Sequence, residues 1–160
     1  MRKFYAFFIS IFIFCLCTST ARTQSINEPI VQYMKADTSS PFPFSDAVRV
    51  GNMLYLSGAI GSDSTGKAVV PGGIEAETRQ ALENIKKTLE RNGSSMDRIV
   101  KCTVMLADIK EWPAMNTVYR TYFAKNRFPA RSAFAGSGLA LGARVEIECI
   151  ATIGIPKGSR

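Results

Sequence analysis

The chain has 160 residues, with 20 lysine and arginine residues, 13 acidic residues, a net charge of +7 and no histidine. This length fits one domain that buries its own core, and the positive charge permits anionic ligands without requiring them. The lack of histidine excludes Ser-His-Asp and Cys-His catalysis and histidine metal sites, which leaves carboxylates, water, backbone groups, Tyr, Lys or Cys as acids and bases.

The first 21 residues have the pattern of a secretory signal peptide. Arg2 and Lys3 precede an apolar run over residues 4–17, and small residues follow up to Ala21. The run has 14 residues, fewer than the ~20 that span a bilayer, which argues against a retained anchor. We therefore expect cleavage after Ala21, a net charge that falls from +7 to +5, and a periplasmic or secreted protein without membrane association. Cys17 leaves a lipoprotein alternative open.

Residues 22–42 are expected to form an N-terminal segment that contains a first strand over residues 30–35, which packs with the main domain over residues 43–155. A loop is expected over residues 37–43, which are rich in Ser, Thr and Pro. Two apolar runs, 47–50 and 53–56, flank Gly51-Asn52. This pattern predicts a β-hairpin.

A long amphipathic helix is predicted from Gly72-Gly73 to a stop at Asn92-Gly93. Its apolar face consists of five residues: Ile74, Ala81, Leu82, Ile85 and Leu89. A strand over 99–106 follows, then a second helix within 108–126 that tolerates Pro113 in its first turn. An apolar stripe on this helix predicts a core face: Trp112, Met115, Tyr119 and Phe123.

Two further strands close the chain and are joined by a glycine-rich loop. The order βββ-α-β-α-ββ predicts an α+β fold, in which strand–helix–strand units give parallel pairing and both helices cover one face of a mixed sheet. The strands are apolar enough that the other face would be exposed in a monomer, so we expect oligomerisation through the sheet. No run of basic residues alternates with aromatic ones, so no specific nucleic-acid binding is predicted.

The last strand carries Glu146 and Glu148, which alternate with an apolar row and therefore share one face. A carboxylate in such a strand needs water, a cationic partner or a function, because burying it unpaired is costly. Arg131 is the candidate partner, since its guanidinium binds carboxylates of protein or ligand bidentately. Cys102 and Cys149 lie in apolar runs and are interpreted as small buried residues; whether they form a disulfide stays open.

Several short motifs, spread from about Pro43 to Ile153, together resemble the signature of the Rid/YjgF family of reactive-intermediate deaminases. They are Phe44-Ser45-Asp46-Ala47-Val48, Gly51-Asn52, Leu56-Ser57-Gly58, Ile99-Val100-Lys101, Met115-Asn116 with Tyr119 and Phe123, Pro129-Ala130-Arg131-Ser132 with Phe134, and Val145-Glu146-Ile147. The resemblance implies a chorismate-mutase-like fold assembled as a homotrimer, with pockets between subunits. It also implies a cofactor-independent hydrolysis of 2-imino or enamine acids.

In this family the arginine at the position of Arg131 holds the substrate carboxylate, and the acid at the position of Glu146 orients or activates the attacking water. The resemblance also assigns substrate-binding positions to Phe44, Gly58, Asn116 and Ala133. Two of these depart from the family pattern. Phe44 replaces a pocket tyrosine and lacks its hydroxyl, whereas Ala133 replaces a frequent cysteine but keeps the carbonyl oxygen that the family uses.

Three functions stay open at this point. The leading one is an imine deaminase; the second is an exported carboxylate-binding protein with little turnover, which Phe44 favours. An endoribonuclease activity, attached to the family by name, ranks last because histidine and a basic-aromatic stripe are both missing. A structural ion pair between Arg131 and Glu146 or Glu148 is the alternative to a catalytic role for these residues.

Overall fold

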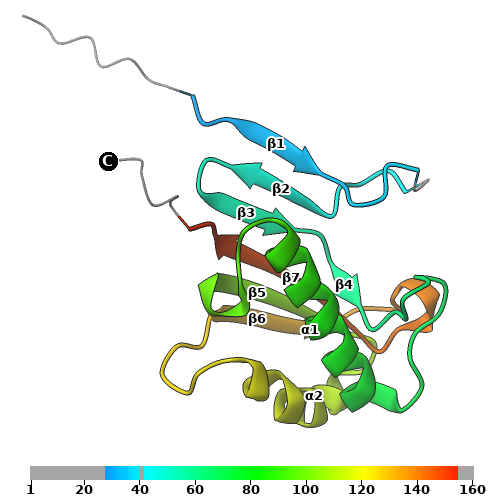
Figure 1. The fold of residues 1–160 in the computed structure, drawn as a ribbon. Coiled ribbons are helices and arrows are strands. Elements are labelled where there is room, and N and C mark those ends of the chain that lie inside the picture. Colours follow the sequence, from blue (N-terminus) through cyan, green and yellow to red (C-terminus); the bar gives the residue numbers. More distant parts are fainter. Residues whose placement is uncertain (1–27, 40–41, 155–160) are drawn as a thin grey trace, which may run out of the picture.

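A computed structural model describes residues 28–39 and 42–154 (Figure 1). The expected signal peptide over residues 1–21 lies outside this range. The described chain forms a seven-stranded mixed sheet with helices α1 and α2 packed on one face. None of the helices within these ranges is long and apolar enough to cross a membrane.

The first three strands, β1 (Val31–Met34), β2 (Ala47–Val50) and β3 (Met53–Leu56), pair antiparallel in succession. The predicted hairpin between β2 and β3 is confirmed, and Gly51 at its turn has a φ of +59° that glycine adopts without strain. The Gly51 N–H also donates to the Ile30 carbonyl at 3.2 Å, which ties the start of β1 to this turn.

Helix α1 (Gly73–Arg91) matches the predicted long helix. Glu75 in its first turn and Arg91 in its last turn both interact favourably with the helix dipole. The five predicted core residues are all buried, and burial of each large aliphatic side chain contributes about 1.5–3 kcal/mol. Gly93, just past the helix end, has a φ of +73°, which explains why the helix stops at this point.

Helix α2 (Trp112–Tyr119) lies between β5 (Ile99–Leu106) and β6 (Ala130–Ala135) and is flanked by 3₁₀ turns at Ile109–Glu111 and Arg120–Tyr122. Met115 and Tyr119 are buried as predicted, and Phe123 is partly buried. The prediction for Trp112 is wrong, because its side chain is 42% exposed. It is the first residue of the helix, where the chain arrives from a surface turn.

Strand β7 (Val145–Thr152) lies near the middle of the sheet, whose order is β1-β2-β3-β7-β5-β6. It pairs antiparallel with β3, β5 and the short strand β4 (Ala59–Ile60). The predicted parallel pairing holds for β5 and β6. It is wrong for β3 and β5, because β7 is inserted between these two strands.

The two faces of the sheet differ sharply. On the helix side, every second residue of β7 is buried, so the prediction that Glu146 and Glu148 share the opposite face is confirmed. No helix of the described chain covers that opposite face (Figure 1). Four large side chains whose register places them on it are exposed: Val31, Tyr33, Tyr55 and Phe134. We call this surface the open face.

Candidate functional site

Arg131 lies on β6, at one edge of the sheet, and is directed to the helix side. Parallel pairing sets Arg131 opposite Cys102, which is buried beneath the helices. Its Nη1 donates a hydrogen bond to Asn116 Oδ1 at 2.7 Å, and its Cζ lies 4.6 Å from the centroid of the Tyr119 ring. The guanidinium is therefore held by an amide at one nitrogen and by an aromatic face beneath it.

Asn116 and Tyr119 are three residues apart on α2 and consequently share one side of the helix. The sequence predicted Asn116 as a pocket residue but interpreted Tyr119 only as core. The structure brings both to Arg131. The i, i+3 spacing is the signal that could have identified Tyr119. Ala133, two residues after Arg131 on the same strand, faces the same side and is half-buried. We call Arg131, Asn116, Tyr119 and Ala133 the clamp group.

The Tyr119 hydroxyl is buried, and among the residues described it makes no hydrogen bond. Burial and, after it, the charge of neighbouring Cys102 raise the pKa of Tyr119 above its ordinary value. The raised pKa favours the neutral phenol, and the ring serves Arg131 as an aromatic support.

Glu146 lies on β7 with its side chain on the open face, opposite Met105 of β5 and Ile60 of β4. A methyl group at Gly58 would collide with the Glu146 carboxylate, so these two residues are in direct contact. The Glu146 side chain is half-buried, and its carboxylate forms no hydrogen bond or ion pair with any residue in the described ranges. Gly58 thus leaves the space that the carboxylate occupies.

Phe44 lies in the segment that precedes β2 and is 54% exposed, stacked on Phe42 with ring centroids 5.6 Å apart. The Ser57 hydroxyl donates to the Ser45 carbonyl at 2.7 Å, which ties the segment of Phe44 to the one that carries Gly58. The segment of Phe44 thus lies next to the one that carries Gly58, whereas the Phe44 ring itself contacts Phe42. We call Phe44, Gly58 and Glu146 the acid group.

The alternative of an ion pair between Arg131 and Glu146 or Glu148 finds no support within the described residues of one chain. Arg131 and the two carboxylates lie on opposite faces of the sheet, since β5 sets Arg131 beside Cys102 but Glu146 beside Met105. The salt bridge that the described residues do contain joins Arg144 to Glu111 at 2.7 Å. Among the described residues, no carboxylate therefore neutralises Arg131.

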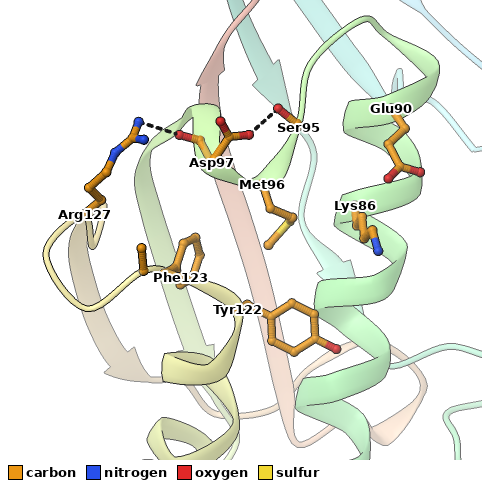
Figure 2. A pocket seen from close by; sticks show the side chains of 9 residues that line it. Lys86, Glu90, Ser95, Met96, Asp97, Tyr122, Phe123 and Arg127 are labelled. Atoms are coloured by element: carbon orange, nitrogen blue, oxygen red, sulfur yellow. Dashed lines mark hydrogen bonds between the residues drawn. The ribbon is translucent and has the colours of Figure 1, made fainter.

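A cleft of about 330 Å³ lies elsewhere, between the C-terminal half of α1 and the connection from α2 to β6 (Figure 2). Met96, Tyr122 and Phe123 form its apolar part, and charged side chains surround it: Lys86, Glu90, Asp97 and Arg127. None of the predicted site residues lines this cleft.

Comparison with known proteins places this geometry in a family. A family model described as endoribonuclease L-PSP matches residues 34–153, which include all of the clamp and acid groups. Residues 1–33 lie outside the match.

Curated relatives cover most of the same region. A goat (Capra hircus) protein named 2-iminobutanoate/2-iminopropanoate deaminase is 46% identical over 70% of this chain and 81% of its own. A mouse (Mus musculus) protein of the same name is 39% identical over 78% of this chain and 94% of its own.

A solved structure of a conserved Rid family protein from Yersinia pestis superposes with a TM-score of 0.71 and 36% identity, covering 78% of this chain and 100% of the other. The expected α+β, chorismate-mutase-like fold is confirmed.

Proposed function

Since the chain belongs to the Rid/YjgF family, we propose that it hydrolyses 2-imino acids and their enamine tautomers to 2-oxo acids and ammonia without a cofactor. The observation that carries this proposal is the clamp group. It presents a permanently charged, half-buried guanidinium that no carboxylate of the described chain neutralises. A small 2-imino acid has the carboxylate that such a group binds.

Arg131 is the proposed carboxylate-binding residue. A guanidinium has five N–H donors in a planar fork, and the contact with Asn116 occupies one nitrogen. The remaining donors are sufficient for a bidentate contact with a carboxylate. Packing on the Tyr119 ring restricts the plane of the fork, so less entropy is lost when the substrate binds.

Glu146 is the proposed base that orients the attacking water. Its carboxylate is half-buried, unpaired within the described residues and next to a glycine that lets other groups approach closely. The water oxygen attacks the imine carbon while Glu146 accepts a proton from the water. Transfer of that proton to nitrogen gives a carbinolamine. The remaining hydroxyl proton then moves to nitrogen as the C–N bond breaks, which releases ammonia and leaves the 2-oxo acid.

We propose that the clamp group of one copy meets the acid group of another, in a homotrimer that closes on the open face. Two observations support this assembly. Arg131 and Glu146 of one chain lie on opposite faces of the sheet, and large apolar side chains are exposed on the open face. A mass measurement in solution tests it, and a stable monomer at micromolar concentration would contradict both the trimer and the shared site.

We also propose that the chain is exported, on the evidence of the signal-peptide pattern in residues 1–21. N-terminal sequencing of protein recovered outside the cytoplasm should begin at Arg22. Recovery of cytoplasmic protein that still begins at Met1 would contradict export.

The decisive experiment measures ammonia release from 2-iminopropanoate, generated in place from alanine by an amino-acid oxidase. The mature protein should accelerate the reaction in proportion to its concentration, and heat-denatured protein is the control. The alternative of a binding protein is favoured by the missing hydroxyl at Phe44. It predicts that pyruvate binds measurably while the rate of ammonia release stays at the uncatalysed level.

A further inference from the structure

Cys102 on β5 and Cys149 on β7 are directly opposite each other in the antiparallel register. Both side chains are buried on the helix side of the sheet, and their sulfur atoms are in hydrogen-bond contact at 2.9 Å. The sequence predicted burial for each cysteine but left their pairing open. The structure decides that the two thiols are neighbours.

The backbone at this position suits a disulfide. Directly opposite residues of antiparallel strands have Cα atoms ~4.5–5.5 Å apart, within the ~4.4–6.8 Å range found across disulfides. A bond between these sulfurs therefore requires side-chain rotation rather than a change in strand pairing. Both thiols are free in this structure.

The thiol pair is connected to the clamp group through Tyr119. The Tyr119 hydroxyl is buried without a hydrogen bond to any described residue, and the Cys102 thiol is near enough to contribute to its raised pKa. Tyr119 also contacts Arg131, whose guanidinium lies over the Tyr119 ring. Cys149, Cys102, Tyr119 and Arg131 thus form one continuous row of contacts from the middle of the sheet to its edge.

The two thiols differ in acidity. The hydrogen bond between the two thiols lowers the pKa of Cys102, and the positive charges of Arg131 and Lys101 act in the same direction. The same hydrogen bond, together with burial, raises the pKa of Cys149. Arg131 is the register partner of Cys102, and a positive charge there favours the thiolate, so we assign Cys102 as the nucleophile and Cys149 as the thiol that resolves an oxidised Cys102.

We propose that Cys102 and Cys149 are a redox-active pair that closes to a cross-strand disulfide, and that closure weakens carboxylate binding by Arg131 through a shift of Tyr119. The inference that binding weakens rests on the proposed function of Arg131, whereas disulfide formation does not. Closure is expected to weaken binding rather than strengthen it because of how Arg131 is now held. Arg131 is already held by both Asn116 and the Tyr119 ring, so displacement of the ring disrupts an ordered clamp.

The proposed oxidant is hydrogen peroxide, whose two-electron reduction gives two waters. The Cys102 thiolate attacks one peroxide oxygen, the O–O bond breaks, and water leaves after protonation, giving a sulfenic acid. The Cys149 sulfur then attacks the Cys102 sulfur, so that the S–S bond forms and the S–O bond breaks. The departing hydroxide takes the Cys149 proton, and the two electrons lost by the thiols reduce the peroxide to two waters.

The test compares mature protein, with residues 1–21 removed, after treatment with dithiothreitol and after treatment with hydrogen peroxide. We expect the peroxide-treated protein to lose two hydrogen atoms in its intact mass and both titratable thiols in denaturant, and dithiothreitol to reverse both changes. Pyruvate binding, measured by calorimetry, should weaken at least about threefold on oxidation and recover on reduction.

Cys149→Ala removes the resolving thiol, and its pyruvate affinity should not change reversibly with peroxide. Val104→Ala is the matched control, because Val104 and Ile147 form the next buried pair along the same two strands, and this variant should still form the disulfide. Two thiols that remain titratable after peroxide, or that gain oxygen without losing hydrogen, would overturn the proposal. A disulfide that leaves pyruvate affinity unchanged would overturn the coupling to Arg131. Pyruvate that binds neither form would instead refute the clamp itself.

Discussion

Arg131 and Glu146 lie on opposite faces of the same sheet. Parallel pairing with β5 places Arg131 on the side of Cys102, and antiparallel pairing with β5 places Glu146 on the side of Met105. The clamp group and the Glu146 carboxylate therefore face apart. If both act on one substrate, each must be completed by a second copy of the chain.

Complementation between inactive variants tests this arrangement. Arg131→Ala and Glu146→Gln should each be inactive alone, but a mixture that is unfolded together and refolded should regain activity. In a cyclic trimer with random assembly, roughly a quarter of the interfaces combine an intact Arg131 with an intact Glu146. Ammonia release from 2-iminopropanoate should then approach about a quarter of the unmutated rate.

The control for complementation is the same two variants refolded separately and then mixed without exchange of subunits. This sample should stay inactive. A site contained within one chain predicts no recovery in either sample.

Arg131→Ala should lower kcat/KM at least roughly a hundredfold, because it removes two charge-assisted hydrogen bonds worth about 1.5–3 kcal/mol each. Arg131→Lys should recover little, since lysine keeps the charge but not the fork. Stability should change little, because Arg131 pairs with no carboxylate in the described chain. Circular dichroism melting checks this, and a loss of about 3–5 kcal/mol would indicate a buried ion pair instead.

Substitutions at Asn116 separate orientation of Arg131 from its charge. Asn116→Ala removes the 2.7 Å hydrogen bond to Nη1 and should raise KM about three- to tenfold with kcat less affected. Asn116→Asp should be more harmful, because its carboxylate would occupy Arg131 and compete with the substrate. Thr117→Ala, at the next and exposed position of α2, is the control and should keep unmutated kinetics. Equal effects of the alanine and aspartate variants would argue against a carboxylate-binding role.

The contact between Gly58 and Glu146 predicts a coupled effect. Gly58→Ala places a methyl group where the Glu146 carboxylate lies, so turnover should fall at least about tenfold while the fold is kept. In a Glu146→Ala background, Gly58→Ala should lower turnover little further, because the carboxylate with which the methyl group collides is absent. The coupling energy follows from the kinetics and melting of four proteins: the unmutated chain, the two single variants and the double variant. Strictly additive losses would show that Gly58 and Glu146 act independently.

Local patterns were sufficient for most of the elements. The Gly51-Asn52 turn, the α1 helix with its buried face and the β5 strand are set by residues within a few positions of each other, so their prediction needs no tertiary information. The alternation of β7 likewise predicted that Glu146 and Glu148 share a face. Trp112 was assigned to the core because the 3.6-residue period was extended to the helix end, where the chain is at the surface.

The sequence by itself also determined the family, because its motifs carry specific residue types at specific spacings along nearly the whole domain. It did not determine which motif residues meet. Which residues meet depends on strand order and register. Strand β7 lies between β3 and β5, and this position brings Gly58 to Glu146 and Cys102 to Cys149. Strand β6 lies at the edge of the sheet and brings Arg131 to Asn116 and Tyr119. A one-residue change in register would exchange the faces of all these side chains, and only the packed sheet selects among registers.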